Sequence, residues 1–410
     1  MLGSNPDAGR WSRRARTAAA LIVVVLASAC DGSVPSVDRY NDGIPDYDRN
    51  RGEKLITGEL MDIANKADLA TPMVRDAALE AAARNTAVAL RRDGLAKVDN
   101  FDTELAHEYL DAMGVTDSAF RSLYFNVLFP GQAAEIMKQN LDIEALTEQF
   151  TNYGVGAVHS AWPPGYIVAV YLTRKQVNLD PLPRRIAKGM SIDIAGTILV
   201  PLTDLRINVD GPFGTDRYLP EIRGTRFAAV IPTTSTGEHR IEVTVVTDQG
   251  PEVAALMTVE VGDTGPSLGN HEDIAYRSIR GVADGRARLL ELINQRRAKE
   301  NLPPVIIDDR LNTMAQAHAE EMRQTGKVSH ISKISGDIAD RARKENIDFA
   351  RITENVAVDQ RVEDAHISFD KSASHRENML DPEVDRVGIG IAFSQTSDSV
   401  YVVENYAKFQ

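Results

Sequence analysis

The chain contains one cysteine, Cys30, in 410 residues, and this feature most limits how it can fold. No disulfide can form within the chain, so each folded part must be held together by its own buried apolar core. Hydrophobic residues make up 43% of the chain and charged residues 26%, which excludes a wholly disordered, collagen-like or multi-span membrane chain. At about 150 residues per domain, we expect two or three domains.

Residues 1–29 have the features of an export signal. Its basic residues are Arg10, Arg13, Arg14 and Arg16. They precede a run of 13 small and apolar residues, 17–29, which is too short to span a bilayer about 30 Å thick. The run ends in Leu26-Ala-Ser-Ala-Cys30, which resembles a bacterial lipobox. We therefore predict a lipoprotein in which Cys30 is acylated, for example with palmitate; the alternative is a plain signal peptide with an accidental cysteine.

The charge of the chain bears on its location and partners. The formal net charge is −13, and residues 1–29 carry +3, so the exported chain would carry −16. Such a chain has no overall electrostatic reason to bind nucleic acid. We expect an exported protein held to the membrane by its lipid anchor, on the periplasmic or cell-surface face.

A polar segment follows the cysteine, and we predict that residues 30–52 form a tether. Its Asp42 to Asp48 stretch spaces acidic residues around a glycine and resembles one thrombospondin type 3 calcium repeat. Closely spaced carboxylates can bind Ca²⁺. A single copy is also typical of a turn-rich tether without calcium, and we favour that interpretation.

The remaining sequence changes character twice. Residues 53–175 are rich in helix formers and end in two predicted strands, so we expect a helical or α+β domain. Residues 176–263 alternate apolar and polar residues with period two, which predicts an immunoglobulin-like β-sandwich in the loose sense, acting as a spacer or binding module. Residues 264–271 form a predicted linker. Residues 272–410 begin with helices and end with strands, so we expect a mixed α+β domain.

Three side chains in the last domain are candidates for chemistry: His330, Glu354 and His375. Two histidines and a glutamate can form a three-ligand zinc site with an open position. They can equally form an acid-base cluster, or a buried polar network that only holds the domain together. Separations of 24 and 21 residues do not show whether the three side chains converge.

The order of short motifs in residues 285–410 resembles the cysteine-rich secretory protein, antigen 5 and pathogenesis-related (CAP, or SCP-like) superfamily, and most of all its disulfide-free bacterial branch. The matching segments are Leu289-Leu-Glu-Leu-Ile-Asn294-Gln-Arg-Arg297, Leu302-Pro-Pro304, Asp309-Arg-Leu311, Ala315-Gln-Ala-His-Ala319, Ser329-His330, Glu354-Asn355-Val-Ala357, Ser372-Ala-Ser-His375-Arg-Glu-Asn-Met-Leu380 and Val387-Gly-Ile-Gly390.

The resemblance implies a three-layer α-β-α sandwich with a central cleft, lined by two histidines and one or two acidic residues. His330, Glu354 and His375 match three of those positions. Asp337 and Asp340 lie in the stretch of the fourth acid, although neither is a glutamate. Some members of the family bind Zn²⁺ in the cleft and some bind sterols or fatty acids elsewhere, while most bacterial members have no known activity.

The N-terminal half contains a possible degenerate copy of the same fold. Residues 72–94 align with 304–326 without a gap, and Gly154-Val-Gly156 parallels Gly388-Ile-Gly390. Further pairs in this alignment are Phe125 with Glu354, Tyr166 with Tyr401, Val168 with Val403 and Tyr171 with Tyr406, while Val98 and Leu141 fall near the histidine positions. The alternative is an unrelated helical domain, because two amphipathic helices agree in pattern without common origin.

We therefore expect a lipid-anchored envelope protein that binds a lipid, a cell-wall component or a protein without catalysing a reaction. One alternative is a metal-assisted hydrolase in which His330 and His375 are ligands and Glu354 is a ligand or general base. The other is a structural envelope protein with no ligand.

Overall fold

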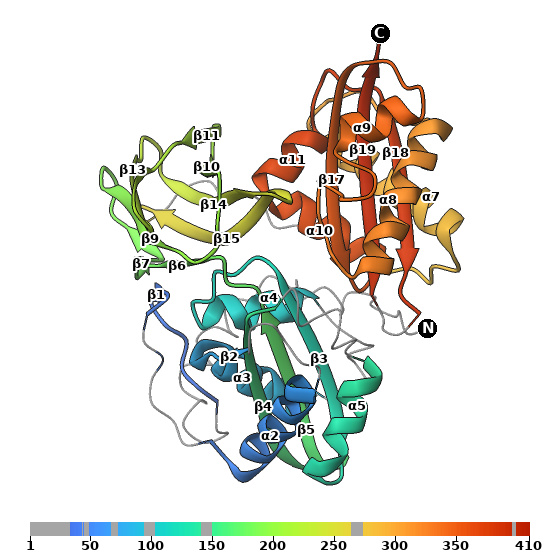
Figure 1. The fold of residues 1–410 in the computed structure, drawn as a ribbon. Helices are drawn as coiled ribbons and strands as arrows, with labels where there is room; N and C mark the ends of the chain where they lie inside the picture. The colour runs from blue at the N-terminus through green and yellow to red at the C-terminus, as the bar shows by residue number, and fades with distance from the viewer. Residues whose placement is uncertain are drawn as a thin grey trace, which may run out of the picture.

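The structure is a computed structural model that describes residues 33–42, 44, 49–66, 73–93, 103–140, 150–263, 274–395 and 399–410. Figure 1 shows an N-terminal α/β region, an all-β region and a C-terminal α/β region, coloured in that order from blue to red. The predicted mixed α+β fold class is confirmed. The predicted signal peptide, Cys30, Asp46, Asp48, Val98, Leu141 and the linker 264–271 lie outside the described residues.

The N-terminal region packs helices on both faces of a four-stranded sheet. The helices are α2 (Arg51–Lys66), α3 (Ala77–Asp93), α4 (Thr103–Ala112) and α5 (Ala133–Asn140), with a 3-10 turn η2 (Pro130–Gln132). The strands, in sheet order, are β2 (Val74–Arg75), β4 (Asn152–Ala161), β5 (Pro164–Thr173) and β3 (Phe120–Val127). Apolar residues alternate along the strands, so one face packs on α2 and α5 and the other on α3 and α4.

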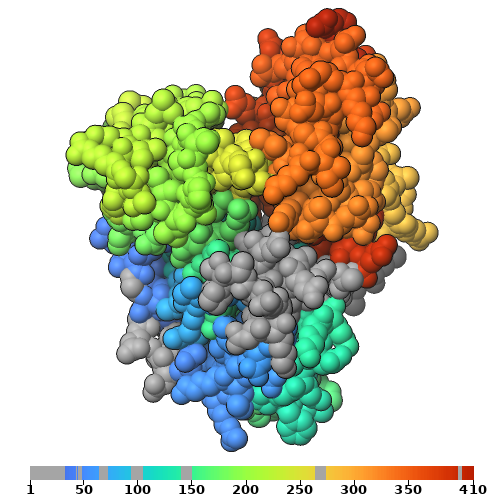
Figure 2. All heavy atoms as spheres, viewed as in Figure 1, coloured from blue at the N-terminus to red at the C-terminus, as the bar shows by residue number. Residues whose placement is uncertain are grey.

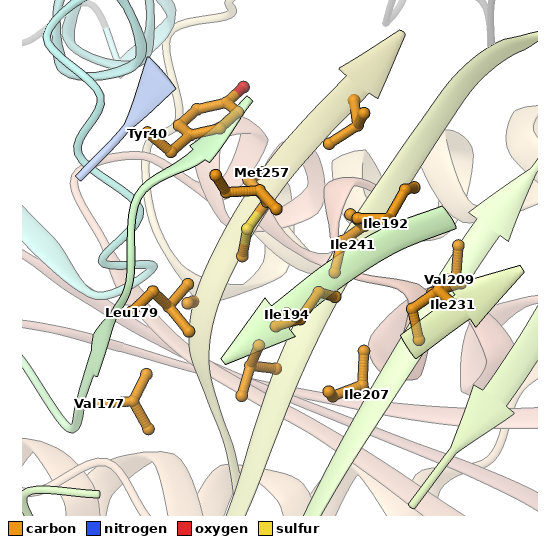
Figure 3. Close-up of a cluster of buried hydrophobic side chains, with 14 of the residues drawn as sticks. Tyr40, Val177, Leu179, Ile192, Ile194, Ile207, Val209, Ile231, Ile241 and Met257 are labelled. Carbon is orange, nitrogen blue, oxygen red and sulfur yellow. The ribbon is translucent and has the colours of Figure 1, made fainter. Parts of the chain in front are cut away.

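The all-β region has two facing sheets. One contains β11 (Gly214–Tyr218), β10 (Asp204–Gly211), β14 (Gly237–Thr247), β15 (Gly250–Val261) and β8 (Arg185–Ile186). The other contains β12 (Glu221–Arg223), β13 (Arg226–Pro232), β9 (Ser191–Ile198) and β6 (Val177–Leu179). Side chains from both sheets, such as Ile194 and Ile241, fill the core between them (Figure 3). The period-two pattern of the sequence therefore buries one side of each strand.

Part of the expected tether is packed rather than free. Tyr40 lies on β1 (Arg39–Tyr40), which pairs with β7 (Leu182–Pro183), and its ring is in the core of the all-β region (Figure 3). Its hydroxyl donates to Asp111 at 2.8 Å and accepts from the Thr258 N–H at 3.2 Å. Burial of an aromatic ring with a satisfied hydroxyl outweighs the polar composition of this segment.

The C-terminal region also has helices on both faces of a four-stranded sheet. The helices are α7 (Val282–Lys299), α8 (Asp309–Thr325), α9 (Ile338–Lys344), α10 (Val362–Lys371) and α11 (Ala373–Met379). The strands, in sheet order, are β16 (Ile306–Ile307), β18 (Arg386–Phe393), β19 (Val400–Phe409) and β17 (Phe349–Asp359). Alternate residues of β19 face α7 and α10 on one side, as Val402 does, or α8 on the other, as Val403 does.

The sheets of the N-terminal and C-terminal regions share their strand order and directions. In each, a two-residue strand runs parallel to its neighbour, and the other pairs are antiparallel. In each sheet, a helix also packs closely against a strand that contains glycines. A Cβ on Gly156 would lie 2.1 Å from the backbone of α3 at Arg84, and a Cβ on Gly390 would lie 2.1 Å from the backbone of α8 at Ala315. Only glycine permits this approach without a shift of the helix.

The strand registers identify equivalent positions in the two sheets. In the N-terminal sheet, Gly154 pairs across the strands with Tyr171, which pairs with Ser122. In the C-terminal sheet, the corresponding glycine, Gly388, pairs with Asn405, which pairs with Glu354. Ser122 therefore occupies the position that corresponds to Glu354.

This register corrects part of the alignment made from sequence. Phe125 is not the counterpart of Glu354, and Tyr171 is not the counterpart of Tyr406. Tyr171 packs on the α3 side of its sheet, whereas Tyr406 packs on the α7 and α10 side of its own. A slip of one residue moves a strand side chain to the opposite face, so sequence similarity between two tyrosines does not fix the register.

Candidate functional site

His330 follows α8, which ends at Gly326 in a left-handed conformation. Nδ1 of His330 lies 3.0 Å from Oε1 of Glu354 on β17, so the structure brings together two residues that are 24 positions apart. Because Nδ1 contacts the carboxylate, Nε2 is left for a different partner.

Both oxygens of Glu354 are engaged. Oε2 accepts a hydrogen bond from Nη2 of Arg341 on α9 at 2.6 Å, and only 7% of Glu354 is exposed. Burial by itself would raise the pKa of Glu354, but the hydrogen bond with His330 and the charge of Arg341 outweigh it and lower the pKa. Glu354 is therefore held as a carboxylate.

His375 lies on the short helix α11, whose N-terminus is capped by Ser372. Its ring packs 5.3 Å from the ring of Phe369, measured between centroids. Loss of hydration of its half-buried ring lowers the pKa of His375 to about 4, against an opposing effect of the carboxylate of Glu242. His375 is therefore neutral near pH 7.

The three predicted residues line one cleft of about 370 Å³. His330 and Glu354 are in direct contact, and His375 faces the same space from α11. The other lining residues are Thr244, Pro251, Glu252, Val253, Ile331, Asp337, Ile338, Thr353, Ser374 and Asn378. The cleft thus combines two imidazoles with several oxygen-bearing side chains.

Asp337 and Asp340, the two candidates for a fourth acid, have structural roles in this arrangement. They form a reciprocal capping box at the start of α9, in which Asp337 accepts from the Asp340 backbone at 2.8 Å. Asp340 also pairs with Arg343 at 2.6 Å. Asp337 lines the cleft, but its carboxylate serves the helix terminus.

The all-β region, for which the sequence predicts a spacer or binding module, contributes to the cleft. Thr244, Pro251, Glu252 and Val253 of the β14–β15 hairpin form one wall of the cleft. The backbone register of this hairpin shifts between Val243 and Thr244, a bulge of the kind that re-aims side chains. In the sequence, Gln249-Gly250-Pro251 is typical of a turn, and a turn gives no indication of a partner about 80 residues away.

Glu242 of β14 also reaches the site. It is 1% exposed, and its carboxylate accepts from Ser372 Oγ at 2.6 Å and from Asn208 Nδ2 at 2.8 Å. Burial would raise the pKa of Glu242, but these hydrogen bonds and the nearby His375 lower it. The start of α11 is therefore fixed by a carboxylate from a different region of the chain.

Neighbouring polar residues hold the walls of the cleft. Nε2 of His318 lies 2.8 Å from the Ser329 carbonyl, and Asn378 donates to the Glu354 carbonyl at 3.1 Å. Asn355 donates to the His375 carbonyl at 3.1 Å. These side chains satisfy buried backbone groups next to the three site residues.

Two features are absent from the described residues. No group of three His, Cys, Asp or Glu side chains in that part of the chain is arranged to hold a metal ion. Over the same residues, no helix is long and apolar enough to cross a membrane.

The class of protein to which the C-terminal domain belongs follows from a match in sequence. Residues 290–406 match the sequence model of the cysteine-rich secretory protein family, so the chain carries a C-terminal domain of that family. The predicted family is thereby confirmed, and the single cysteine fits its disulfide-free branch.

Two curated relatives are from Bacillus subtilis (strain 168). The uncharacterized protein YkwD is 30% identical over 104 residues, which are 25% of this chain and 40% of YkwD. The uncharacterized membrane protein YlbC is 28% identical over 122 residues, which are 30% of this chain and 34% of YlbC. The chain thus spans less than half the length of these relatives.

Two solved structures are also similar. An outer surface protein from Borrelia burgdorferi has a TM-score of 0.30 at 20% identity, over 31% of this chain and 94% of that chain. An extracellular protein containing a SCP domain from Bacillus anthracis str. Ames has a TM-score of 0.28 at 15% identity, over 53% of this chain and 78% of that chain. With scores this low, the family assignment depends on the sequence match alone.

Proposed function

We propose that this chain is an exported, lipid-anchored protein of the cell envelope whose C-terminal cleft binds a ligand without catalysing a reaction. The observation that carries the proposal is that His330 and His375 line one cleft, with His330 oriented by a buried carboxylate. A lipid, a cell-wall component and a protein are all compatible as partners.

We propose Zn²⁺ as a ligand of this cleft, because its donors fit the chemistry of that ion. A neutral imidazole offers a lone pair, and His375 is neutral near pH 7 because its pKa is about 4. A carboxylate at Nδ1 is the usual outer partner of a zinc-binding histidine, and Glu354 has this relation to His330. When bound, the ion would supply Lewis acidity. His330 and His375 would hold it, and Glu354, whose two carboxylate oxygens are already paired, would orient His330.

The lipid anchor and the location are part of the same proposal. The sequence around Cys30 supports acylation, and one similar solved structure is described as an extracellular protein. A calcium ion at Asp42–Asp48 remains a weaker prediction.

We also propose the finer architecture expected from sequence. Helices on both faces of the C-terminal sheet support a three-layer α-β-α sandwich, and the two facing sheets of residues 176–263 support an immunoglobulin-like domain. The shared strand order and glycine contacts support a degenerate CAP-like copy in residues 53–175.

The hydrolase alternative requires Glu354 to move a proton or bind a metal. Both of its oxygens are already paired, one with His330 and one with Arg341, which favours the binding function. A hydrolase would lose turnover in Glu354→Gln while keeping its fold. A purely structural protein would lose only stability when His330 or His375 is removed.

Calorimetric Zn²⁺ titration of residues 31–410 tests the proposal, with the His330→Ala/His375→Ala double variant as control. We expect binding at one site that the double variant loses. Absence of binding by the folded wild type would remove zinc from the proposal and leave lipid and protein ligands to be tested.

A further inference from the structure

The turn between β14 and β15 is inserted at the edge of the C-terminal cleft. The carbonyl of Gln249 accepts hydrogen bonds from two consecutive backbone amides after α8, His330 N at 3.0 Å and Ile331 N at 3.1 Å. Ser329 Oγ lies 2.9 Å from the same carbonyl and 2.7 Å from the Ile331 carbonyl, so its one proton is shared between the two. Figure 2 shows this turn, in yellow, lodged against the orange C-terminal region. Successive backbone N–H groups that converge on one point make a site for an oxygen acceptor, here a backbone carbonyl.

The fit extends to the next residue of the turn. Gly250 has a φ of +102°, and a Cβ at this position would lie 2.8 Å from Cβ of His330. The site therefore accepts a glycine in the left-handed region directly after the bound carbonyl.

The donors are held in place by their own domain. Nε2 of His318 contacts the Ser329 carbonyl, and Arg341 donates to the His330 carbonyl at 3.3 Å and to the Gly336 carbonyl at 2.8 Å. The turn is supported from the other side, because Leu256 N of β15 donates to the Thr116 carbonyl at 2.8 Å. Receptor and occupant are thus each formed by separate parts of the chain.

The surrounding contacts between the two regions are polar. Asp210 pairs with Arg376, Glu377 pairs with Arg217 at 3.1 Å, and Glu242 accepts from Ser372. Such interfaces within a chain resemble transient protein–protein contacts, which separate and reform.

We propose that Ser329, His330 and Ile331 form a receptor for a peptide β-turn, occupied in this chain by its own Gln249–Gly250 turn. A partner of the matching class is a peptide whose turn presents a carbonyl followed by glycine. It binds when the internal turn is withdrawn, and it reaches the His330 side of the cleft. The proposal is independent of zinc.

The test uses the exported chain with Cys30→Ser, which prevents acylation, and a cyclised peptide of residues 245–253 as the probe. Gly250→Val removes the internal turn from the site. Gly189→Val is the matched control, because Gly189 has a φ of +82° in the same region and its Cβ would meet nothing within 4 Å. Amide hydrogen exchange reports the state of His330 and Ile331, and fluorescence anisotropy reports peptide binding.

We expect Gly250→Val to speed exchange at these two amides. We also expect it to bind the peptide at least about tenfold more tightly than the wild type. An internal turn that occupies the site about nine-tenths of the time weakens the binding of an external peptide about tenfold. Gly189→Val should behave as the wild type does. A peptide in which valine replaces the glycine should not bind.

Two results would overturn the proposal: unchanged exchange at His330 and Ile331 in folded Gly250→Val, or exposed amides without peptide binding. If Gly250→Val does not fold, Gly250→Ala is measured instead, because its Cβ would still lie 2.8 Å from Cβ of His330. Weakening the contact by the equivalent of one neutral hydrogen bond should speed exchange at the two amides about fivefold, and no change there would equally refute the receptor.

Discussion

The two α/β regions are built on sheets with the same strand order, but the residues at one corresponding position differ in chemistry. In the C-terminal sheet, Glu354 is buried and paired with His330 and Arg341. In the N-terminal sheet, the corresponding residue is Ser122. Beside it, Tyr171 is fully buried and its hydroxyl lies 2.8 Å from that of Thr86.

This contrast indicates that the packing of helices on the sheets is independent of the polar residues of the cleft. The glycine contacts with α3 and α8 are equally close in the two regions, so the helix-on-sheet packing does not depend on the polar cluster. A tyrosine that fills its site in one sheet stands where Asn405 lies in the other. The two sheets therefore share their helix packing and differ in the side chains at these two corresponding positions.

The largest expected effect separates the two equivalent positions. Glu354→Ala leaves the buried guanidinium of Arg341 without its carboxylate, and removal of one partner of a buried ion pair costs about 3–5 kcal/mol. Ser122→Ala removes one hydroxyl and should cost about 1 kcal/mol or less. Chemical denaturation, with hydrogen exchange of the amides of β19 and β5 as the probe, measures the loss of stability in the two variants. Equal losses would contradict the assignment of different roles.

The next effect concerns pH and the C-terminal cleft. The unfolded chain protonates His375 below its ordinary pKa of 6.5, but the folded protein does so only near 4. The contribution of His375 to stability is therefore intact above pH 6.5, decreases on acidification and is lost by about pH 4, a change of up to about 3 kcal/mol. The free energy of unfolding of the wild type and of His375→Gln, measured at several pH values, isolates the contribution of His375. Parallel curves for the two proteins would refute the lowered pKa.

The smallest expected effect concerns the close packing of a helix on a glycine, which the N-terminal and C-terminal sheets share. Gly156→Ala and Gly390→Ala each place a Cβ against a helix backbone, and overpacking of this kind costs about 1–3 kcal/mol. Gly58→Ala on α2 is the control, because its Cβ meets nothing within 4 Å, and it should be neutral or stabilising by about 0.5–1 kcal/mol. If only one of the two strand variants were destabilised, the two sheets would differ in how their helices pack.

Much of the candidate site could be predicted from sequence because its residues lie in short, ordered motifs. His330, Glu354 and His375 were named from those motifs, and they line one cleft. The fourth acid could not be assigned, since whether Asp337 faces a ligand or caps a helix depends on where α9 begins.

The sequence alone determined the periodic patterns of the three regions, the family of residues 290–406 and the glycines that allow a helix to approach a sheet, because each is a local property of residue type and spacing. The tertiary structure decided the register that equates Ser122 with Glu354, and the insertion of the Gln249–Gly250 turn beside His330. Both depend on contacts between residues far apart in the chain. A strand pattern of period two and a four-residue turn are compatible with many partners, and only packing in three dimensions selects one of them.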